Sequence, residues 1–429
     1  MKRFATKVFA VVLAVVFVMS FVACSGGEQK AEAAPAAQTE TKTETKTETK
    51  TETKTETKTE TKAETIKVGV LAPLTGGVAE YGNAVNNGVT MFFDELNAKG
   101  GINGKQVELI AYDEEGDQVK AVTGYNSLMD QGVVAIVGDV TTGPTKAVVA
   151  ESQADGTPMI TASATAEDVT CQLDADGKVV AVYENMFRSC FIDPFQGSKM
   201  AAFAKEVLGA KTAAVIYNTG SDYSVGCYKA FKETAEKQGL EVVAEESYAD
   251  GAVDFQSQLT NIAAKNPDVL FVPDYYGVIV NMAKQSFDAG VKAVMLGADG
   301  WDSVASKIDD PQMLNGFYYC SGYSPEDTRP EVQTFAENYK AKYGADSLNM
   351  FSAQGYDAAM IMAAAIEKAE ASGAKAGSDE YRQAIIAALK ATDMDCVTGH
   401  VVYNEYNNPE KSAAIITFEN GAAKYWGNY

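Results

Sequence analysis

The sequence predicts an α/β fold in which two units of similar plan follow one another along the chain. Short apolar segments alternate with helical patterns between residues 66 and 161, and a second alternation runs from residue 195 to residue 297. The chain has 429 residues, more than a typical single domain. Strict alternation favours right-handed β-α-β units on a parallel sheet covered on both faces. Any ligand is then expected outside the carboxyl ends of the strands.

The first unit is predicted from buried strands and from the helical spacing of apolar residues. Its first strand reads Ile66-Lys-Val-Gly-Val-Leu71, which is typical of a strand buried on both faces. The expected strands are 66–71, 107–112, 133–137 and 158–161, and the expected helices are 82–99, 117–131 and 145–155.

A polar interlude that contains Cys171 and Cys190 precedes the second unit. That unit is expected to have helices at 195–208, 224–238, 255–265 and 278–289, and strands at 212–217, 240–248, 269–273 and 293–297. A third, mostly helical section is predicted at 331–343, 351–368 and 378–391, followed by strands near Val401, at 413–419 and at 422–425.

Residues 1–23 have the features of an export signal peptide. A basic start precedes an apolar run from Val8 to Val22 that is too short and wrongly flanked for a membrane span. Phe21-Val-Ala-Cys24 resembles a bacterial lipobox, and this resemblance implies cleavage before Cys24 and attachment of lipid to its sulfur. A soluble secreted protein with an incidental cysteine is the alternative.

Residues 24–65 carry the predicted lipidated Cys24 and then a repeated Thr-Glu-Thr-Lys sequence. The repeat has no apolar pattern to bury, so we expect a disordered linker. A coil of about 40 residues reaches about 30–40 Å and would act as a tether. The protein is therefore expected to be exported and lipid-anchored to the outer face of the cell membrane, or on its periplasmic side.

The composition and the missing motifs argue against several classes of function. A formal net charge of -22 makes nucleic acid an unsuitable partner, because phosphate backbones require clustered Lys and Arg. The sequence has no phosphate-binding loop, no G-x-G-x-x-G after the first strand, no G-x-S-x-G and no H-E-x-x-H. The single histidine, His400, is expected to be structural. We therefore expect no enzymatic activity, no cofactor and no metal site.

A stretch from Gly138 to Thr165 suggests an anion-binding edge on the first unit. Thr141 and Thr142 lie where a strand turns into a helix, and Ser163 and Thr165 follow the next strand. Backbone N–H groups at a helix start are unpaired and carry a partial positive charge, so a carboxylate could dock there. The alternative is that these residues only cap and turn the chain.

The opposite wall of a cleft is predicted from residues that follow strands of the second unit. Tyr223, Tyr275 and Asp299 each follow such a strand, and Tyr81 follows the first strand of the chain. An anion site that faces aromatic rings and one acid describes a cleft for a small zwitterion, with its ammonium paired to Asp299. A desolvated acid requires such a partner.

Several short motifs, in order, resemble those of the branched-chain amino acid binding proteins of ABC importers. The similarity covers residues 66 to 429. It rests on Ile66-Lys-Val-Gly-Val-Leu-Ala-Pro-Leu-Thr-Gly76, Ala79-Glu-Tyr-Gly82, Asn97-Ala-Lys-Gly-Gly-Ile-Asn-Gly-Lys105, Tyr112-Asp113, the Gly138 stretch, Pro194-Phe-Gln-Gly197 and Gly355-Tyr-Asp357. The resemblance implies a periplasmic binding protein type I fold, with two Rossmann-like lobes joined by three crossovers and closing over a ligand between them.

The resemblance also implies boundaries and roles. The N-terminal lobe would comprise 66–190 plus 323–398 and the C-terminal lobe 191–322 plus 399–429, with crossovers near 189–194, 321–325 and 398–401. By position in the family, the ligand carboxylate would meet Thr142, Ser163 and Thr165, and its ammonium would meet Asp299. The aromatic walls would be Tyr81, Tyr223, Tyr275 and Phe351.

These expectations combine into a solute-binding lipoprotein of an ABC importer, a monomer that captures an amino acid of the branched-chain type or a related one and delivers it to a membrane permease. Asp299 stands where several relatives have Glu, and Asp274 beside Tyr275 is unusual. Amides, aromatic acids and short peptides therefore stay open as ligands. A ligand-sensing subunit of a membrane receptor is the alternative function.

The cysteines suit an exported protein, in which disulfides persist. Cys171 and Cys190 flank the polar interlude and are expected to form a disulfide, with free thiols as the alternative. Cys320 and Cys396 both lie near expected crossovers and are a further candidate pair, which leaves Cys227 unpaired.

Overall fold

The computed structural model describes residues 64–429, which lie within one compact unit. The predicted signal peptide, Cys24 and the Thr-Glu-Thr-Lys repeat lie outside the described residues. Within residues 64–429, none of the helices combines the length and the apolar character that crossing a membrane requires.

The first lobe is built on a five-stranded parallel sheet. Its strands are β1 (Ile66–Ala72), β2 (Val107–Asp113), β3 (Ala135–Val137), β4 (Met159–Thr161) and β7 (Met186–Arg188). The strand order is β2-β1-β3-β4-β7, and every neighbouring pair runs parallel. Because the strands are parallel, the loops after β1, β3 and β4 all leave the sheet at one edge.

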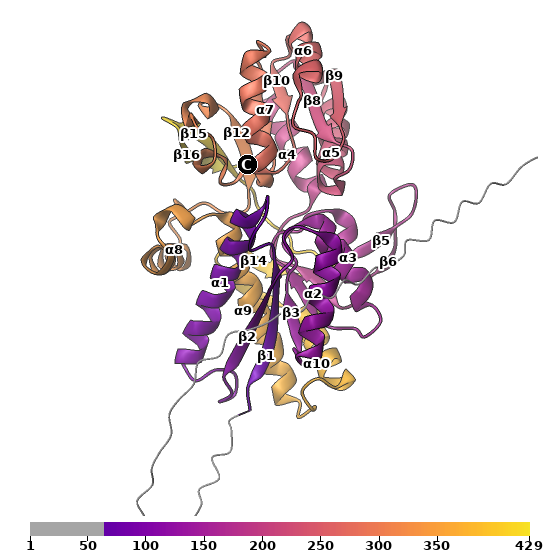
Figure 1. Cartoon of the computed structure of the whole chain (residues 1–429), viewed down its shortest axis with the longest axis vertical. Helices are drawn as coiled ribbons and strands as arrows, with labels where there is room; N and C mark the ends of the chain where they lie inside the picture. Colours follow the sequence, from indigo (N-terminus) through magenta and orange to yellow (C-terminus); the bar gives the residue numbers. More distant parts are fainter. Residues whose placement is uncertain (1–63) are drawn as a thin grey trace, which may run out of the picture. The chain divides into compact units, whose positions relative to one another are not determined.

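Helices from two distant parts of the chain surround this sheet. They are α1 (Ala79–Ala98), α2 (Gln118–Asp130), α3 (Thr142–Ser152), α8 (Pro330–Tyr343), α9 (Met350–Ala371) and α10 (Asp379–Lys390). Figure 1 shows the late helices α9 and α10 beside the early strands β1 to β3. Gly88 permits the close packing of α1 on α9, because a Cβ there would lie 2.1 Å from the carbonyl oxygen of Ser352.

The second lobe has a seven-stranded mixed sheet. Its strands are β8 (Thr212–Asn218), β9 (Glu241–Tyr248), β10 (Val269–Phe271), β11 (Val294–Gly297), β12 (Tyr318–Ser321), β15 (Ala414–Glu419) and β16 (Ala422–Asn428), in the order β16-β15-β12-β11-β10-β8-β9. The hairpin β15–β16 adds antiparallel strands to a parallel core. Its helices are α4 (Asp193–Glu206), α5 (Asp222–Gln238), α6 (Gln256–Lys265) and α7 (Tyr276–Asp288).

Two short hairpins and five 3₁₀ turns complete the fold. The hairpins pair β5 (Cys171–Leu173) with β6 (Val179–Val182), and β13 (Asp393–Cys396) with β14 (Gly399–Val402). The turns are η1 (Glu167–Val169), η2 (Asp299–Trp301), η3 (Val304–Ser306), η4 (Pro311–Leu314) and η5 (Ala345–Ser347).

Helix α3 begins at Thr142, three residues before the predicted start at 145. Pro144 is its third residue, and a proline is tolerated there because the first four N–H groups of a helix have no partner within it. The earlier start places Thr141 at the N-cap and Thr142 in the first turn. Both threonines therefore lie at the positive end of the helix, which matters for the site below.

The chain passes between the lobes three times, and the third passage lies later than predicted. The first follows β7 at 189–192 and the second spans 322–329. The third was expected at 398–401, but β14 folds back on β13, and the amide of Asn407 donates to the carbonyls of Tyr183 and Met186 in the first lobe. The third passage therefore lies between residues 408 and 414.

The predicted Cys171–Cys190 disulfide is not formed, which corrects the sequence-based expectation. Both are buried free thiols, as are Cys227, Cys320 and Cys396 among the described residues, so the suggested Cys320–Cys396 pair is also wrong. The Cys171 thiol donates to the carbonyl of Glu167 (3.3 Å), and the Cys190 thiol lies 3.6 Å from the carbonyl of Ala164. The two sulfurs are thus directed to different carbonyls.

Candidate functional site

A small cavity of ≈ 10 Å³, the enclosed cavity of this site, lies where loops of both lobes meet. It is lined by Tyr81, Val140, Thr141, Ser163, Thr165, Tyr223, Tyr275, Asp299, Gly300 and Phe351. Eight of the nine residues singled out from the sequence are in this set. The ninth, Thr142, lines an adjoining, wider cleft together with Thr141 and Tyr275. The structure thus brings the predicted residues to one place, whereas their role in binding is a separate question.

The first lobe contributes the end of α3 and the loop after β4. Thr141, the N-cap residue of α3, makes no side-chain cap hydrogen bond. The Ser163 hydroxyl donates to the carbonyl of Val140 (2.7 Å), which joins the two loops. This wall therefore presents hydroxyl groups and the positive end of a helix.

Arg188 holds the loop after β4 in place through buried hydrogen bonds. Its guanidinium is fully buried and donates to the carbonyls of Ala164 (3.0 Å) and Ala166 (2.9 Å). Burial lowers the pKa of Arg188 from its ordinary value, and the hydrogen bonds compensate for the lost hydration. The positions of Ser163 and Thr165, on either side of Ala164, are fixed as a result.

The second lobe contributes a single buried acid. Asp299 is 3% exposed, and its carboxylate accepts a hydrogen bond from the Tyr223 hydroxyl (2.8 Å). Burial raises the pKa of Asp299 to about 6, while hydrogen bonds from Tyr223 and Gln196 act in the opposite direction. None of the ten described residues that line the cavity is basic. A charged Asp299 therefore has hydrogen-bond donors but no cation beside it.

Aromatic rings form the remaining walls and connect the lobes. Tyr81 stacks on Phe351 with ring centroids 4.1 Å apart, and Tyr223 stacks on Tyr275 at 5.0 Å. The Tyr81 hydroxyl donates to the carbonyl of Gly300 in the second lobe (2.6 Å) and accepts from the backbone N–H of Tyr276 (3.0 Å). These rings give the cavity an apolar surface next to its polar groups.

Ion pairs on both sides of the cleft also join the lobes. Lys146 of α3 lies 2.5 Å from Asp222 of α5, and Lys307 pairs with Glu80 of α1. Together with the Tyr81 hydrogen bonds, these contacts show the two lobes closed against each other.

Asp274 is buried rather than facing solvent. Its carboxylate accepts from the Tyr248 hydroxyl (2.5 Å) and from the backbone N–H of Tyr275 (2.7 Å). Burial raises its pKa to about 6. Asp274 lines the wider cleft and not the enclosed cavity, so its hydrogen bonds orient the loop that carries Tyr275.

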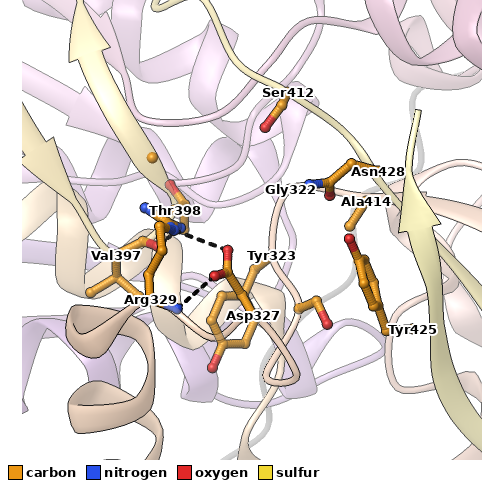
Figure 2. A pocket seen from close by; sticks show the side chains of 12 residues that line it. Gly322, Tyr323, Asp327, Arg329, Val397, Thr398, Ser412, Ala414, Tyr425 and Asn428 are labelled. Atoms are coloured by element: carbon orange, nitrogen blue, oxygen red, sulfur yellow. Dashed lines mark hydrogen bonds and ion pairs between the residues drawn. The ribbon is translucent and has the colours of Figure 1, made fainter.

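A second polar cavity, of ≈ 350 Å³, lies among the second and third passages between the lobes (Figure 2). Its one guanidinium, from Arg329, is already occupied by Asp327 (3.0 Å) and by the carbonyl of Val397 (2.8 Å). This cavity therefore offers no uncompensated charge to a ligand, in contrast to the cavity at Asp299.

Sequence reasoning missed Val140 and Gly300, which line the cavity with their backbones, and Gln196, whose amide contacts Asp299. A contact made by a backbone group does not depend on the type of side chain, so the sequence does not indicate it. Gln196 lies in the Pro194-Phe-Gln-Gly197 motif, so a signal was present without an assigned role.

The cavity offers contacts to a small charged ligand. The described residues contain no group of three or more His, Cys, Asp or Glu side chains placed to hold a metal ion. Two hydroxyl residues, the end of a helix and a buried acid instead offer complementary contacts to the two charges of a zwitterion.

Comparison with known proteins agrees with this geometry. The chain matches the family described as periplasmic binding protein over residues 65–423. The Leu/Ile/Val-binding protein BraC3 of Rhizobium johnstonii is 30% identical over 361 residues, which are 83% of this chain and 92% of that relative.

Two solved structures are also similar. The branched-chain amino acid transporter substrate binding protein LivJ from Streptococcus pneumoniae, in complex with isoleucine, has a TM-score of 0.74 and 31% identity, covering 85% of this chain and 100% of that chain. The leucine binding protein LivK from Thermotoga maritima has a TM-score of 0.73 and 29% identity, covering 85% and 98%. These matches confirm the fold and the resemblance predicted from the sequence, and the chain belongs to the periplasmic binding protein family.

Proposed function

We propose that this protein captures an α-amino acid of the branched-chain class and delivers it to an ABC permease. The observation that carries the proposal is the enclosed cavity, in which the buried, cation-free Asp299 faces Ser163, Thr165 and the uncapped end of α3. The names of the relatives support the same class of ligand, since BraC3 is a Leu/Ile/Val-binding protein and LivJ was crystallised with isoleucine.

In this proposal the ligand ammonium pairs with the carboxylate of Asp299. Tyr223 already donates to one carboxylate oxygen, so the hydroxyl holds the acid in one orientation before the ligand arrives. The ammonium supplies the missing positive charge, and this compensates for burying the carboxylate.

The ligand carboxylate meets the opposite wall. Thr165 and Thr141 contribute hydroxyl groups there, Thr142 contributes the first turn of α3, and the Ser163 hydroxyl, which donates to Val140, joins the two loops of this wall. N–H groups at a helix start favour an anion. Because every α-amino acid has this carboxylate and this ammonium, these contacts recognise the shared part of the ligand.

The aromatic walls would then receive the ligand side chain. Tyr81, Phe351 and Tyr275 present ring surfaces next to the polar groups. Burial of an aliphatic side chain against these rings is favourable, and a charged side chain would lose its hydration there. This favours leucine, isoleucine and valine over acidic or basic amino acids.

The proposed export and membrane attachment of the protein follow from its N-terminal sequence. The basic and apolar start and the Phe21-Val-Ala-Cys24 sequence support export and lipid attachment at Cys24. A monomer tethered in this way would stay close to a permease in the same membrane.

Isothermal titration calorimetry of the purified protein with leucine, isoleucine and valine tests the proposal. Asp299→Asn keeps the size of the side chain and removes its charge, so we expect isoleucine affinity to fall about a hundredfold or more. Asp250→Asn is the matched control, because Asp250 lines the wider cleft and not the enclosed cavity. Wild-type affinity in Asp299→Asn would contradict the assigned role of this acid, and no binding of any of the three amino acids would contradict the proposed ligand class.

A further inference from the structure

The first turn of α4 contacts both walls of the proposed ligand site. This turn follows the first passage between the lobes and contains Asp193 and Gln196, two polar residues with no exposed surface. Neither residue lines the enclosed cavity, so neither is assigned a contact with the ligand.

Gln196 bonds to the acid side of the site. Its amide oxygen accepts from the backbone N–H of Asp299 (2.9 Å), and its amide nitrogen donates to the carboxylate of Asp193 (3.2 Å). Because each end of the amide has its own partner, the side chain is fixed in one orientation. The backbone of Asp299 is thereby attached to α4, although the two residues lie 103 positions apart.

Asp193 bonds to the hydroxyl side. Its backbone N–H donates to the carbonyl of Thr165 (2.9 Å). Thr165 is in the first lobe and Asp193 opens the second. One helical turn therefore connects Thr165, through Asp193 and Gln196, to Asp299.

The position of this turn is fixed by close packing on α5. A Cβ on Gly197 would lie 2.3 Å from the carbonyl oxygen of Cys227, and one on Gly226 would lie 2.7 Å from the carboxylate of Asp193. Helix α5 also carries Tyr223, which donates to Asp299. The start of α4 and the start of α5 therefore support Asp299 from its backbone and from its side chain.

We propose that Asp193 and Gln196 are positioning residues that hold the ammonium-binding and carboxylate-binding halves of the site in register across the first passage between the lobes. The inference rests on the proposed function and deepens it, because it explains the Pro194-Phe-Gln-Gly197 motif by contacts to Asp299 and Thr165.

The ionisable groups around Asp299 affect its pKa, and this pKa gives a way to measure the positioning role. Burial raises the pKa of Asp193 to about 8, so this residue is largely neutral at pH 7 and spares Asp299 a second buried anion. The other titratable groups that act on or face Asp299 are Tyr81, Cys190, Tyr223, Cys227, Tyr275, Asp302 and Cys320, and Arg188 acts on Asp193. From the first turn of α4, the hydrogen bond of Gln196 lowers the pKa of Asp299.

Two substitutions test the two residues separately. Gln196→Met removes a hydrogen bond that lowers the pKa of Asp299, so the pH below which isoleucine binding weakens should move up, and affinity at pH 7.5 should fall about tenfold. Asp193→Leu removes the acceptor of the Gln196 amide, so affinity at pH 7.5 should fall about fivefold, while the pH below which binding weakens should stay near that of the wild type, because Asp193 is already largely neutral there.

The experiment is calorimetric titration with isoleucine from pH 5 to pH 8.5, combined with ¹³C NMR of the aspartate carboxyls in the ligand-free protein, with Asp299 assigned by the signal lost in Asp299→Asn. Asn185→Leu is the control: it removes a buried amide of the first lobe that bonds Ser152 and Thr157, so stability should fall while both pH profiles stay unchanged.

An upward shift of the pH profile in Gln196→Met, together with weaker isoleucine binding by Asp193→Leu at pH 7.5, supports the inference. If both variants keep the wild-type affinity and pH profile, or if Asn185→Leu changes them equally, the positioning role is overturned even though the protein binds isoleucine. If the wild type does not bind isoleucine, the proposed function fails, and the NMR titration of Asp299 still decides the positioning role.

Discussion

At the scale of single residues, the chemistry of the site depends on Asp299. Its carboxyl is buried, it accepts a hydrogen bond from Tyr223, and no basic residue lines its cavity. Burial alone disfavours the charged form, which is why its pKa is raised to about 6. An ammonium placed beside it would reverse that preference.

This shift predicts how binding depends on pH. The ligand ammonium requires ionised Asp299, and with a pKa of about 6 the acid is mostly ionised at pH 7.5 and mostly protonated at pH 5. Isoleucine affinity should therefore be flat above pH 7 and weaken by about tenfold for each pH unit below 6. Calorimetry across this range checks the slope, and Asp299→Asn should remove it. Affinity that is constant down to pH 5 would contradict the pairing.

The same group links pH to stability. Its folded pKa lies above the ordinary value of 3.8, so its contribution to the stability of the ligand-free protein is fully present below that ordinary pKa and is lost as pH rises through 6. A ligand ammonium paired with Asp299 restores the stability that is lost. The rise in melting temperature caused by saturating isoleucine should therefore be larger at pH 7.5 than at pH 5, as measured by differential scanning fluorimetry.

At the scale of elements, α3 serves both the site and the closed arrangement. Its uncapped start faces the proposed carboxylate position, and Lys146 in its second turn pairs with Asp222 of α5. Lys146 also pairs with Asp168 of the first lobe (2.5 Å), which holds its ammonium toward the cleft. One helix therefore contributes to ligand contact and to contact between the lobes.

Lys146→Met should weaken closure while leaving the ligand contacts intact. The pair is partly exposed, so we expect an isoleucine affinity loss of less than about fivefold, expressed as faster dissociation. Stopped-flow measurements of isoleucine dissociation in 50 and 500 mM salt test this. Salt screens the ion pair, so it should weaken closure less in the variant, which lacks the pair, than in the wild type. Lys120→Met is the control, since Lys120 pairs with Glu115 within one lobe. Equal dissociation rates for Lys146→Met and the wild type would show that the pair does not contribute.

At the scale of the whole molecule, two lobes are joined by three short passages and close over the cavity. The lobes meet through the ring of Tyr81 and through polar contacts and ion pairs at the cleft edges, while each lobe has its own sheet and helices. Such an arrangement favours opening by a hinge at the passages over deformation of either lobe.

Opening and closing should be visible in solution. Small-angle scattering of the ligand-free protein is expected to give a larger radius of gyration than scattering with saturating isoleucine, because ligand contacts from both lobes favour the closed form. Asp299→Asn should show no such change at the same isoleucine concentration. A radius that is identical with and without ligand in the wild type would contradict closure on binding.

The local sequence determined the elements and much of the site, since apolar runs and helical spacing report burial directly. Strand ends marked by Thr141, Ser163, Tyr223 and Asp299 could be assigned to one edge because parallel strands end at a common edge. Eight of nine predicted residues line the enclosed cavity, most of them for this reason, whereas Phe351 of α9 was assigned only through the family resemblance. The start of α3 was misplaced because Pro144 was not taken as part of the first turn.

Only the tertiary structure decided contacts between residues far apart in the chain. The Gln196–Asp299 bond spans 103 positions, the third passage was displaced by Asn407 docking on the first lobe, and the thiols of Cys171 and Cys190 stayed apart. Sequence pattern reports whether a residue is buried, but the partner of a buried polar group depends on how distant elements pack. The sequence by itself therefore determined the α/β plan and the residue types at its edge, while packing decided which of them meet.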